Sequence, residues 1–142
     1  MLDKVINIML VEDDEVDVMN VKRAFIKNHI SNPLLVASDG IEAMELLQEL
    51  ANQNKALPRI ILLDLNMPRM GGIEFLKELR QDPKLKYISV FIMTTSNEDN
   101  DKIEAYHLNV AGYILKPLSM QRFIEAVSTL KSYWTLCEYP EK

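Results

Sequence analysis

Residues 60–68 read IILLDLNMP, a run of four aliphatic residues that leads directly into an acidic residue, Asp64. A run of this length and composition is typical of a β-strand that is buried on both faces of a parallel sheet. Further apolar runs of strand length occur along the chain: Ile6 to Val11, Leu34 to Ala37, Val90 to Met93 and Gly112 to Leu115. Short runs separated by longer stretches predict strand-helix-strand units.

The longer stretches carry apolar residues at the spacing of one helix face. These stripes are Val18, Val21 and Phe25; Ile41, Met44, Leu47 and Leu50; Ile73, Leu76 and Leu79 within residues 72–81; Ile103, Tyr106 and Leu108 after a polar cap at residues 96–99; and Phe123, Val127, Leu130 and Trp134. Because strand-helix-strand crossovers are right-handed, we expect an α/β fold with a doubly wound sheet. Ligands of such sheets bind beyond the C-terminal ends of the strands.

The composition is that of an ordinary globular domain. The chain has 142 residues, 48% hydrophobic and 26% charged, with a net charge of −5. We expect residues 1–142 to form one domain, with 131–142 as the end of the last helix plus a tail, and no output domain. No apolar segment reaches the roughly 18 residues of a membrane span, and the lone Cys137 fits a reducing compartment. We therefore expect a cytoplasmic protein without membrane or nucleic acid partners.

Polar residues follow the strands of the predicted sheet. In chain order they are Glu12, Asp13, Asp14, Asp64, Asn66, Thr94 and Lys116. Since neighbouring parallel strands end at one edge, the carboxylates of Glu12, Asp13 and Asp64 should converge there and repel one another unless a cation intervenes. Mg²⁺, or Mn²⁺ in its place, prefers such oxygen ligands. The predicted ligands are Asp13, Asp64, the backbone carbonyl of Asn66, and Glu12 acting through water.

The same residues suit the transfer of a phosphoryl group. A carboxylate such as Asp64 can attack phosphorus if the site is electropositive and open to the donor. The metal ion and Lys116 would supply positive charge, and the hydroxyl of Thr94 could contact the transferred oxygens. The acidic residues Asp14, Glu15 and Asp17 are expected to cap and solvate the first helix instead.

Four sequence motifs in this order resemble those of response-regulator receiver domains. They are Val11-Glu12-Asp13-Asp14; Asp64-Leu65-Asn66-Met67-Pro68 with Gly71-Gly72; Met93-Thr94-Thr95-Ser96; and Gly112-Tyr113-Ile114-Leu115-Lys116-Pro117. The resemblance spans nearly the whole chain. It implies a flavodoxin-like fold of five strand-helix units, with strand order 2-1-3-4-5.

The resemblance also implies a role for each matching residue. Asp64 would be the phosphoacceptor, Thr94 and Tyr113 a switch pair, and Lys116 a contact of the phosphoryl group. Glu12 and Asp13 would be the acidic metal pair. The peptide bond between Lys116 and Pro117 is expected to be cis, which X-Pro bonds tolerate at low cost.

The partners expected from this function are proteins. The chain lacks a kinase motif, so a sensor histidine kinase or a phosphotransfer protein would supply the phosphoryl group. The chain is not expected to be an enzyme beyond self-phosphorylation from small donors and slow auto-dephosphorylation. Less specifically, residues 12–14 with Asp17, residues 94–97 and the aromatic tail resemble those of receivers paired with bacterial phytochrome-type kinases. A homodimer or the docking of another partner is expected through the fourth helix, fifth strand, fifth helix and tail residues 133–136. The Trp, Leu and Tyr side chains of this tail need burial, either on the domain or across a two-fold axis.

Other protein classes share parts of this pattern. A flavodoxin-like electron carrier would need a phosphate-binding loop after the first strand, where the acidic Glu12, Asp13 and Asp14 stand instead. An aspartyl-phosphate hydrolase usually has a second Asp two residues after the nucleophile, where this chain has Asn66. A receiver-like binding module that is not phosphorylated is the remaining alternative.

Overall fold

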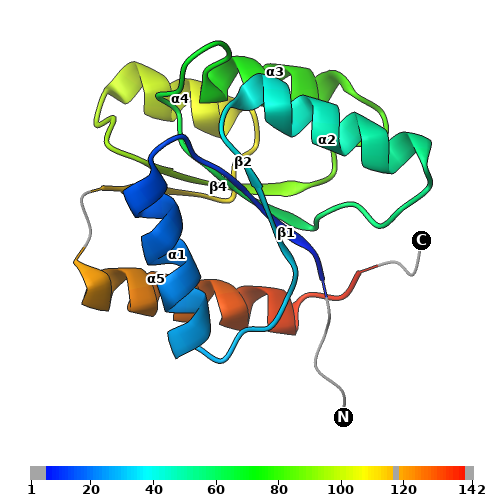
Figure 1. The fold of residues 1–142 in the computed structure, drawn as a ribbon. Coiled ribbons are helices and arrows are strands. Elements are labelled where there is room, and N and C mark those ends of the chain that lie inside the picture. Colours follow the sequence, from blue (N-terminus) through cyan, green and yellow to red (C-terminus); the bar gives the residue numbers. More distant parts are fainter. Residues whose placement is uncertain (1–5, 117–118, 140–142) are drawn as a thin grey trace.

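The computed structural model describes residues 6–116 and 119–139, which alternate strands and helices along the chain (Figure 1). The elements are β1 Ile8–Val11, α1 Glu15–Lys27, β2 Leu34–Ala37, α2 Gly40–Asn52, β3 Ile60–Leu63, α3 Gly72–Gln81, β4 Ser89–Thr94, α4 Asp99–His107, β5 Gly112–Leu115 and α5 Met120–Leu136. All five expected strands are present, which confirms the pattern of apolar runs.

The strands form one parallel sheet in the order β2-β1-β3-β4-β5, as expected. Helices α1 and α5 cover one face, and α2, α3 and α4 cover the other (Figure 1). The buried side chains of β1 and β3 serve both layers, because successive residues of a strand point to opposite faces. Among the described residues no helix is long and apolar enough to span a membrane.

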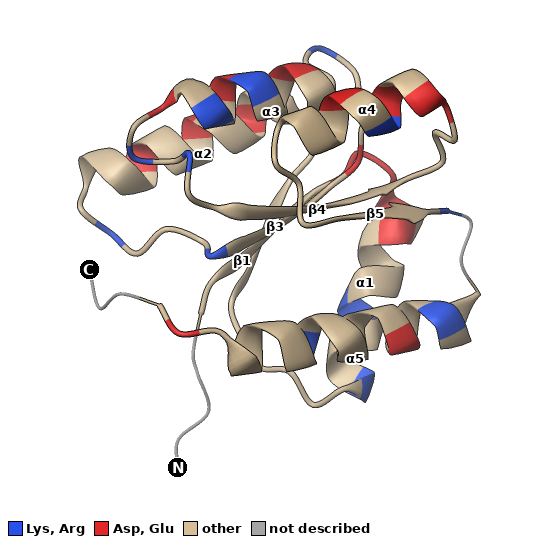
Figure 2. Cartoon of the chain, turned by 180° about the vertical axis from the view of Figure 1, so that it is seen from behind, with Lys and Arg blue, Asp and Glu red and all other residues tan. Residues whose placement is uncertain are grey.

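The charges of the layer α2–α3–α4 are mainly acidic. Figure 2 shows more Asp and Glu than Lys and Arg along these three helices. Nucleic acid binding relies on clustered positive charge. This layer of the described chain therefore offers no broad positive field to a nucleic acid.

Helix α5 packs through the apolar stripe that the sequence predicted. Phe123, Val127, Leu130 and Trp134 are all buried. The ring of Trp134 lies 6.4 Å from that of Phe25 in α1, centroid to centroid. Trp134 is thus buried within its own domain and is not available to a dimer surface, whereas Leu136 is exposed.

Helix α4 does not pack as predicted. Ile103 and Tyr106 were expected to face the core, but the side chains of both are exposed. Ala105 is the buried residue of this helix, and Leu108 packs on the core only after the helix ends. At 3.6 residues per turn, Ala105 is about 200° around the helix from Ile103, so burying Ala105 turns Ile103 to solvent. The polar cap also differs, because Glu98 precedes the helix without a side-chain capping bond.

Candidate functional site

The site lies where β1 and β3 end side by side. Val11 pairs with Leu63, and the Asp64 amide donates to the Val11 carbonyl at 3.0 Å. This register brings Glu12, Asp13 and Asp64 together, with one carboxylate oxygen of each within 4.8 Å of the others. The predicted convergence of these three carboxylates is confirmed.

The carboxylate of Asp64 is buried but incompletely paired. Asp64 is 6% exposed, and its Oδ1 atom is buried with no hydrogen-bond partner among residues 6–116 and 119–139. A buried, unpaired carboxylate oxygen is costly unless another group satisfies it. The acidic cluster and this free oxygen fit a divalent cation, which Glu12, Asp13 and Asp64 could hold. Asn66 is exposed in the loop that follows β3. Its backbone carbonyl stays a predicted ligand of the metal ion.

Helix α3 begins very close to the Asp64 loop. A Cβ atom at Gly72 would lie 2.5 Å from the Asp64 carbonyl oxygen and 2.7 Å from the Leu65 Cα. These backbone atoms leave no room for a side chain at position 72. The absence of a Cβ there lets α3 start directly against the loop that holds Asp64.

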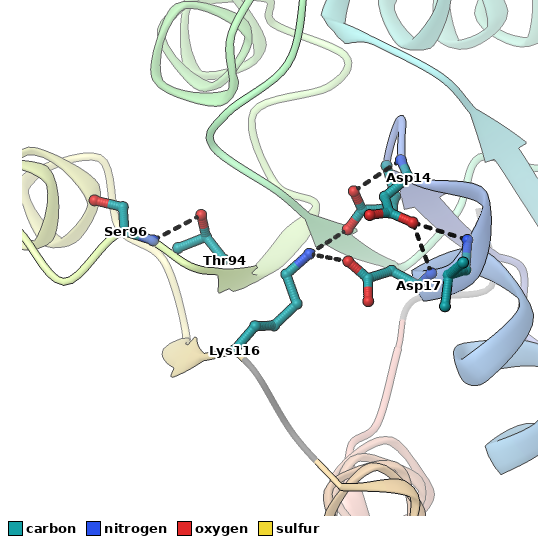
Figure 3. A network of polar contacts seen from close by, with 7 residues as sticks. Asp14, Asp17, Thr94, Ser96 and Lys116 are labelled. Atoms are coloured by element: carbon teal, nitrogen blue, oxygen red, sulfur yellow. Dashed lines mark hydrogen bonds and ion pairs between the residues drawn. The ribbon is translucent and has the colours of Figure 1, made fainter.

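Lys116 reaches from the end of β5 to the acidic residues that follow β1 (Figure 3). Its Nζ atom donates to Glu12 Oε1 at 2.7 Å and to Asp17 Oδ2 at 2.6 Å. The side chains of Lys116 and Glu12 are each only 5% exposed, so this ion pair is buried. The sequence predicted Lys116 at the site. The role given to Asp17 was incomplete, because Asp17 binds Lys116 as well as standing in the first turn of α1.

Burial and pairing shift the pKa values of this ion pair. Burial raises the pKa of Glu12 to about 7, although the hydrogen bond from Lys116 opposes the rise. Burial disfavours the charge of Lys116, but its hydrogen bonds to Asp17 and Glu12 leave its pKa raised. Within this pair the lysine is held as an ammonium ion, and Glu12 loses its proton at a higher pH than an exposed glutamate does.

Asp14 caps α1, as the sequence predicted. Its Oδ1 atom accepts from the amide of Val16 at 2.8 Å and from the amide of Asp17 at 3.3 Å. The Asp14 amide in turn donates to Glu12 Oε2 at 3.2 Å. The cap thereby fixes the first turn of α1 against the acidic cluster.

The predicted switch residues both bond to the backbone of one residue, Ser96. Thr94 is fully buried at the end of β4, and its Oγ1 atom accepts from the Ser96 amide at 3.3 Å. The Tyr113 hydroxyl donates to the Ser96 carbonyl at 2.9 Å. Both residues are thus tied to Ser96, whose backbone role the sequence did not reveal. The predicted cis bond between Lys116 and Pro117 lies outside the described residues.

The comparisons with known proteins agree with this geometry. The model of the response regulator receiver domain family matches residues 8–128. The chain is 37% identical over 128 residues to the response regulator Rcp1 of Synechocystis sp., covering 89% of this chain and 87% of Rcp1. It is 35% identical to the probable methanogenesis regulatory protein FilR2 of Methanothrix harundinacea, covering 89% of this chain and 82% of FilR2.

Solved structures give the same result. The Mn²⁺-bound form of Rcp1 superimposes with a TM-score of 0.82 at 34% identity, covering 96% of this chain and 99% of that one. The phosphorylated cyanobacterial phytochrome response regulator RcpA superimposes with a TM-score of 0.84 at 32% identity, covering 98% and 100%. The fold, the acidic cluster able to bind a divalent metal and these similarities lead to one conclusion: the chain belongs to the response regulator receiver family, the phosphoacceptor proteins of two-component signalling.

Proposed function

We propose that Asp64 accepts a phosphoryl group from a phosphohistidine on a sensor histidine kinase or a phosphotransfer protein. The observation that carries this proposal is the buried Oδ1 of Asp64, which has no hydrogen-bond partner in the described part of the chain and lies in one cluster with Glu12, the partner of Lys116, and Asp13. One carboxylate oxygen of Asp64 forms a bond to phosphorus while the bond from phosphorus to the imidazole nitrogen breaks. The imidazole leaves with that electron pair and takes up a proton from solvent.

The residues around Asp64 support this reaction by placing charge and hydrogen-bond donors. The Lys116 ammonium and the Thr94 hydroxyl contact the transferred oxygens, which carry the negative charge of the reaction. Asp13, Asp64, the Asn66 carbonyl and, through water, Glu12 would hold Mg²⁺, with Mn²⁺ as a substitute. Such an ion would supply positive charge that offsets the repulsion between the carboxylates and the incoming phosphoryl group. The Mn²⁺-bound form of the similar Rcp1 supports a divalent ion here.

Phosphoramidate tests the acceptor residue because its phosphorus-nitrogen bond resembles that of phosphohistidine. Wild-type chain incubated with phosphoramidate and Mg²⁺ should gain the mass of one phosphoryl group in intact mass spectrometry. Asp64→Asn should gain none, because an amide is not a nucleophile towards phosphorus. Glu15→Gln, which removes an exposed carboxylate next to the site, is the matched control and should be labelled like the wild type. A wild-type chain that stays unlabelled would favour the binding-module alternative.

A phytochrome-type histidine kinase is the donor that we favour, acting with this chain in the cytoplasm. The similarity to Rcp1 and to the phytochrome response regulator RcpA supports this pairing. Transfer of radiolabelled phosphate from a purified phytochrome-type kinase should be at least about tenfold faster than from a chemotaxis kinase, a difference of 1.4 kcal/mol in barrier. Equal rates from the two kinases would contradict the pairing.

The signal then passes to the surface formed by α4, β5 and α5, where we propose that a second copy docks. Thr94 at the end of β4 and Tyr113 in β5 link the site to this surface, because both bond to the backbone of Ser96. Movement of Thr94 towards a phosphoryl group would break its bond to Ser96 and free space for the Tyr113 ring. Exposed apolar residues on the surface support docking of a partner: Ile103, Tyr106, Leu115 and Tyr133.

Sedimentation velocity with beryllofluoride, a phosphoryl mimic, tests this switch and surface together. The mimic should shift the wild type towards a dimer. Ile103→Glu should stay monomeric, because a charge on the exposed face of α4 disrupts an apolar contact. Exposed Ile26 on α1, changed to Glu, is the matched control and should dimerise like the wild type. A wild-type chain that is monomeric with and without the mimic would contradict the dimer.

A further inference from the structure

Lys116 donates to two carboxylates, neither of which is the proposed phosphoacceptor. Its Nζ atom lies 2.6 Å from Asp17 Oδ2 and 2.7 Å from Glu12 Oε1, and the lysine side chain is only 5% exposed. The Oδ1 atom of Asp64 meanwhile has no hydrogen-bond partner among the residues that the structure describes. In this state the ammonium lies on the side of the site where α1 begins (Figure 3).

Asp17 differs from the other carboxylates of the site. The metal-compatible cluster consists of Glu12, Asp13 and Asp64, and Asp17 is not part of it. Asp17 stands in the first turn of α1, where its amide is bound by the Asp14 cap, so its backbone is fixed. Its side chain is 24% exposed and its bond to Lys116 joins residues 99 positions apart in the chain. Binding Lys116 is thus the contact that the structure gives to this carboxylate.

We propose that Asp17 is a positioning residue that holds Lys116 in the unphosphorylated chain and competes with the phosphoryl group for its ammonium. This inference rests on the function proposed above and deepens it. The three N–H donors of an ammonium share one nitrogen atom. Lys116 therefore cannot keep its bond to Asp17 while that nitrogen moves towards oxygens on Asp64. The bond between Lys116 and Asp17 is therefore the contact that phosphorylation must break. This bond favours the unphosphorylated state, and its strength determines how readily Asp64 is phosphorylated.

Two consequences follow for a chain without the Asp17 carboxylate. The Lys116 amine loses one of its two acceptors and becomes more accessible to reagents. A phosphoryl mimic no longer has to displace Asp17, so the mimic binds more tightly. If Asp17 only stabilised α1, its removal would change the reactivity of the Lys116 amine and the affinity for the mimic no more than removal of another acidic residue in the first turn.

The experiment compares Asp17→Asn and Asp17→Ala with Glu15→Gln. Glu15 is exposed in the same first turn, so its replacement removes an equal charge from the same helix end but leaves the Lys116 contacts in place. Asp17→Glu keeps a carboxylate. In this variant the reactivity of Lys116 and the affinity for the phosphoryl mimic should therefore lie closer to the wild-type values than in Asp17→Asn or Asp17→Ala. Asp17 is partly exposed, so its variants should fold, and urea unfolding of each variant verifies this.

The first readout is acetylation of the folded, metal-free chain by acetic anhydride, measured at Lys116 by peptide mass spectrometry. Asp17→Asn and Asp17→Ala should raise the acetylation rate of Lys116 about three- to fivefold, which corresponds to the free energy of a partly exposed ion pair. The acetylation rates of Lys77 and Lys131 should not change. The second readout is titration with beryllofluoride and Mg²⁺, in which both variants should bind about three- to fivefold more tightly than Glu15→Gln. The acetylation readout needs no phosphoryl chemistry.

The outcomes separate this inference from the proposed function. Lys116 reactivity equal in Asp17→Ala and Glu15→Gln would overturn the competition. Weaker binding of beryllofluoride in Asp17→Ala would also overturn it, since Asp17 would then direct Lys116 towards the acceptor. If beryllofluoride binds no variant, the proposed function fails, and the acetylation rates still decide whether Asp17 holds Lys116.

Discussion

Replacing Lys116 with alanine is expected to lower the free energy of unfolding of the metal-free chain by about 3–5 kcal/mol at pH 8.5. The change leaves Glu12, which is 5% exposed, without its cation and next to the Asp64 carboxylate. A buried charge that loses its partner costs more than the pair contributes, because the charge remains away from water. Urea unfolding in the presence of a chelator, at fixed protein concentration, measures the loss.

The pH dependence of this loss identifies Glu12 as its cause. The pKa of Glu12 is raised in the folded chain from 4.5 to about 7, so protonated Glu12 favours folding and its ionisation costs stability as the pH rises. Without Lys116, which lowers this pKa, the folded pKa rises further. The loss in Lys116→Ala should therefore be large at pH 8.5 and much smaller at pH 6.

A double variant provides the control for this prediction. Adding Glu12→Gln to Lys116→Ala removes the unpaired carboxylate and should recover most of the lost stability at pH 8.5. If the double variant is as unstable as Lys116→Ala, the loss comes from the packing of the lysine stem and not from its charge.

Divalent cations are expected to stabilise the chain strongly. A ligand that binds only the folded state at 100 times its dissociation constant adds about 2.7 kcal/mol to the free energy of unfolding. Mg²⁺ should have this effect because it offsets the repulsion among Glu12, Asp13 and Asp64, whose oxygens lie within 4.8 Å of one another. Mn²⁺ should substitute for it. Urea unfolding across a titration of each ion measures the gain.

Asp13→Asn is the variant that tests where the ion binds. Asp13 is the exposed member of the cluster, so its replacement should remove most of the gain from Mg²⁺ with little change to the metal-free chain. Glu15→Gln is again the matched control and should keep the full gain. An equal gain in Asp13→Asn and the wild type would place the ion elsewhere.

The sequence predicted the sheet and the edge that carries the site. Runs such as residues 60–63 are entirely buried, so their hydrophobicity alone identifies them as central strands. The convergence of Glu12 and Asp64 followed from the parallel arrangement of β1 and β3, which needs no knowledge of side-chain contacts. The local hydrophobic pattern was sufficient to identify the strands that are buried on both faces, because few other structures fit such a pattern.

The contacts that the sequence did not predict are long-range or depend on rotation of a helix. The bond between Lys116 and Asp17 spans 99 residues, and no local pattern indicates it. The available signal was that Asp17 lies in the first turn of the helix that directly follows the acidic residues at the end of β1. In α4 the small Ala105 faces the core, so counting large apolar residues selected the wrong face. Ser96 acts through its backbone, which the identity of its side chain does not reveal.

Chemical trapping of the phosphorylated chain tests the identity of the acceptor most directly. Borohydride reduces an acyl phosphate on an aspartate to homoserine, so the modified residue can be located by peptide mass spectrometry. After phosphorylation with phosphoramidate and Mg²⁺, homoserine should appear at position 64 and at no other aspartate. Homoserine at Asp13, or a chain without homoserine that nevertheless carries phosphate, would contradict the assignment of Asp64 as the phosphoacceptor.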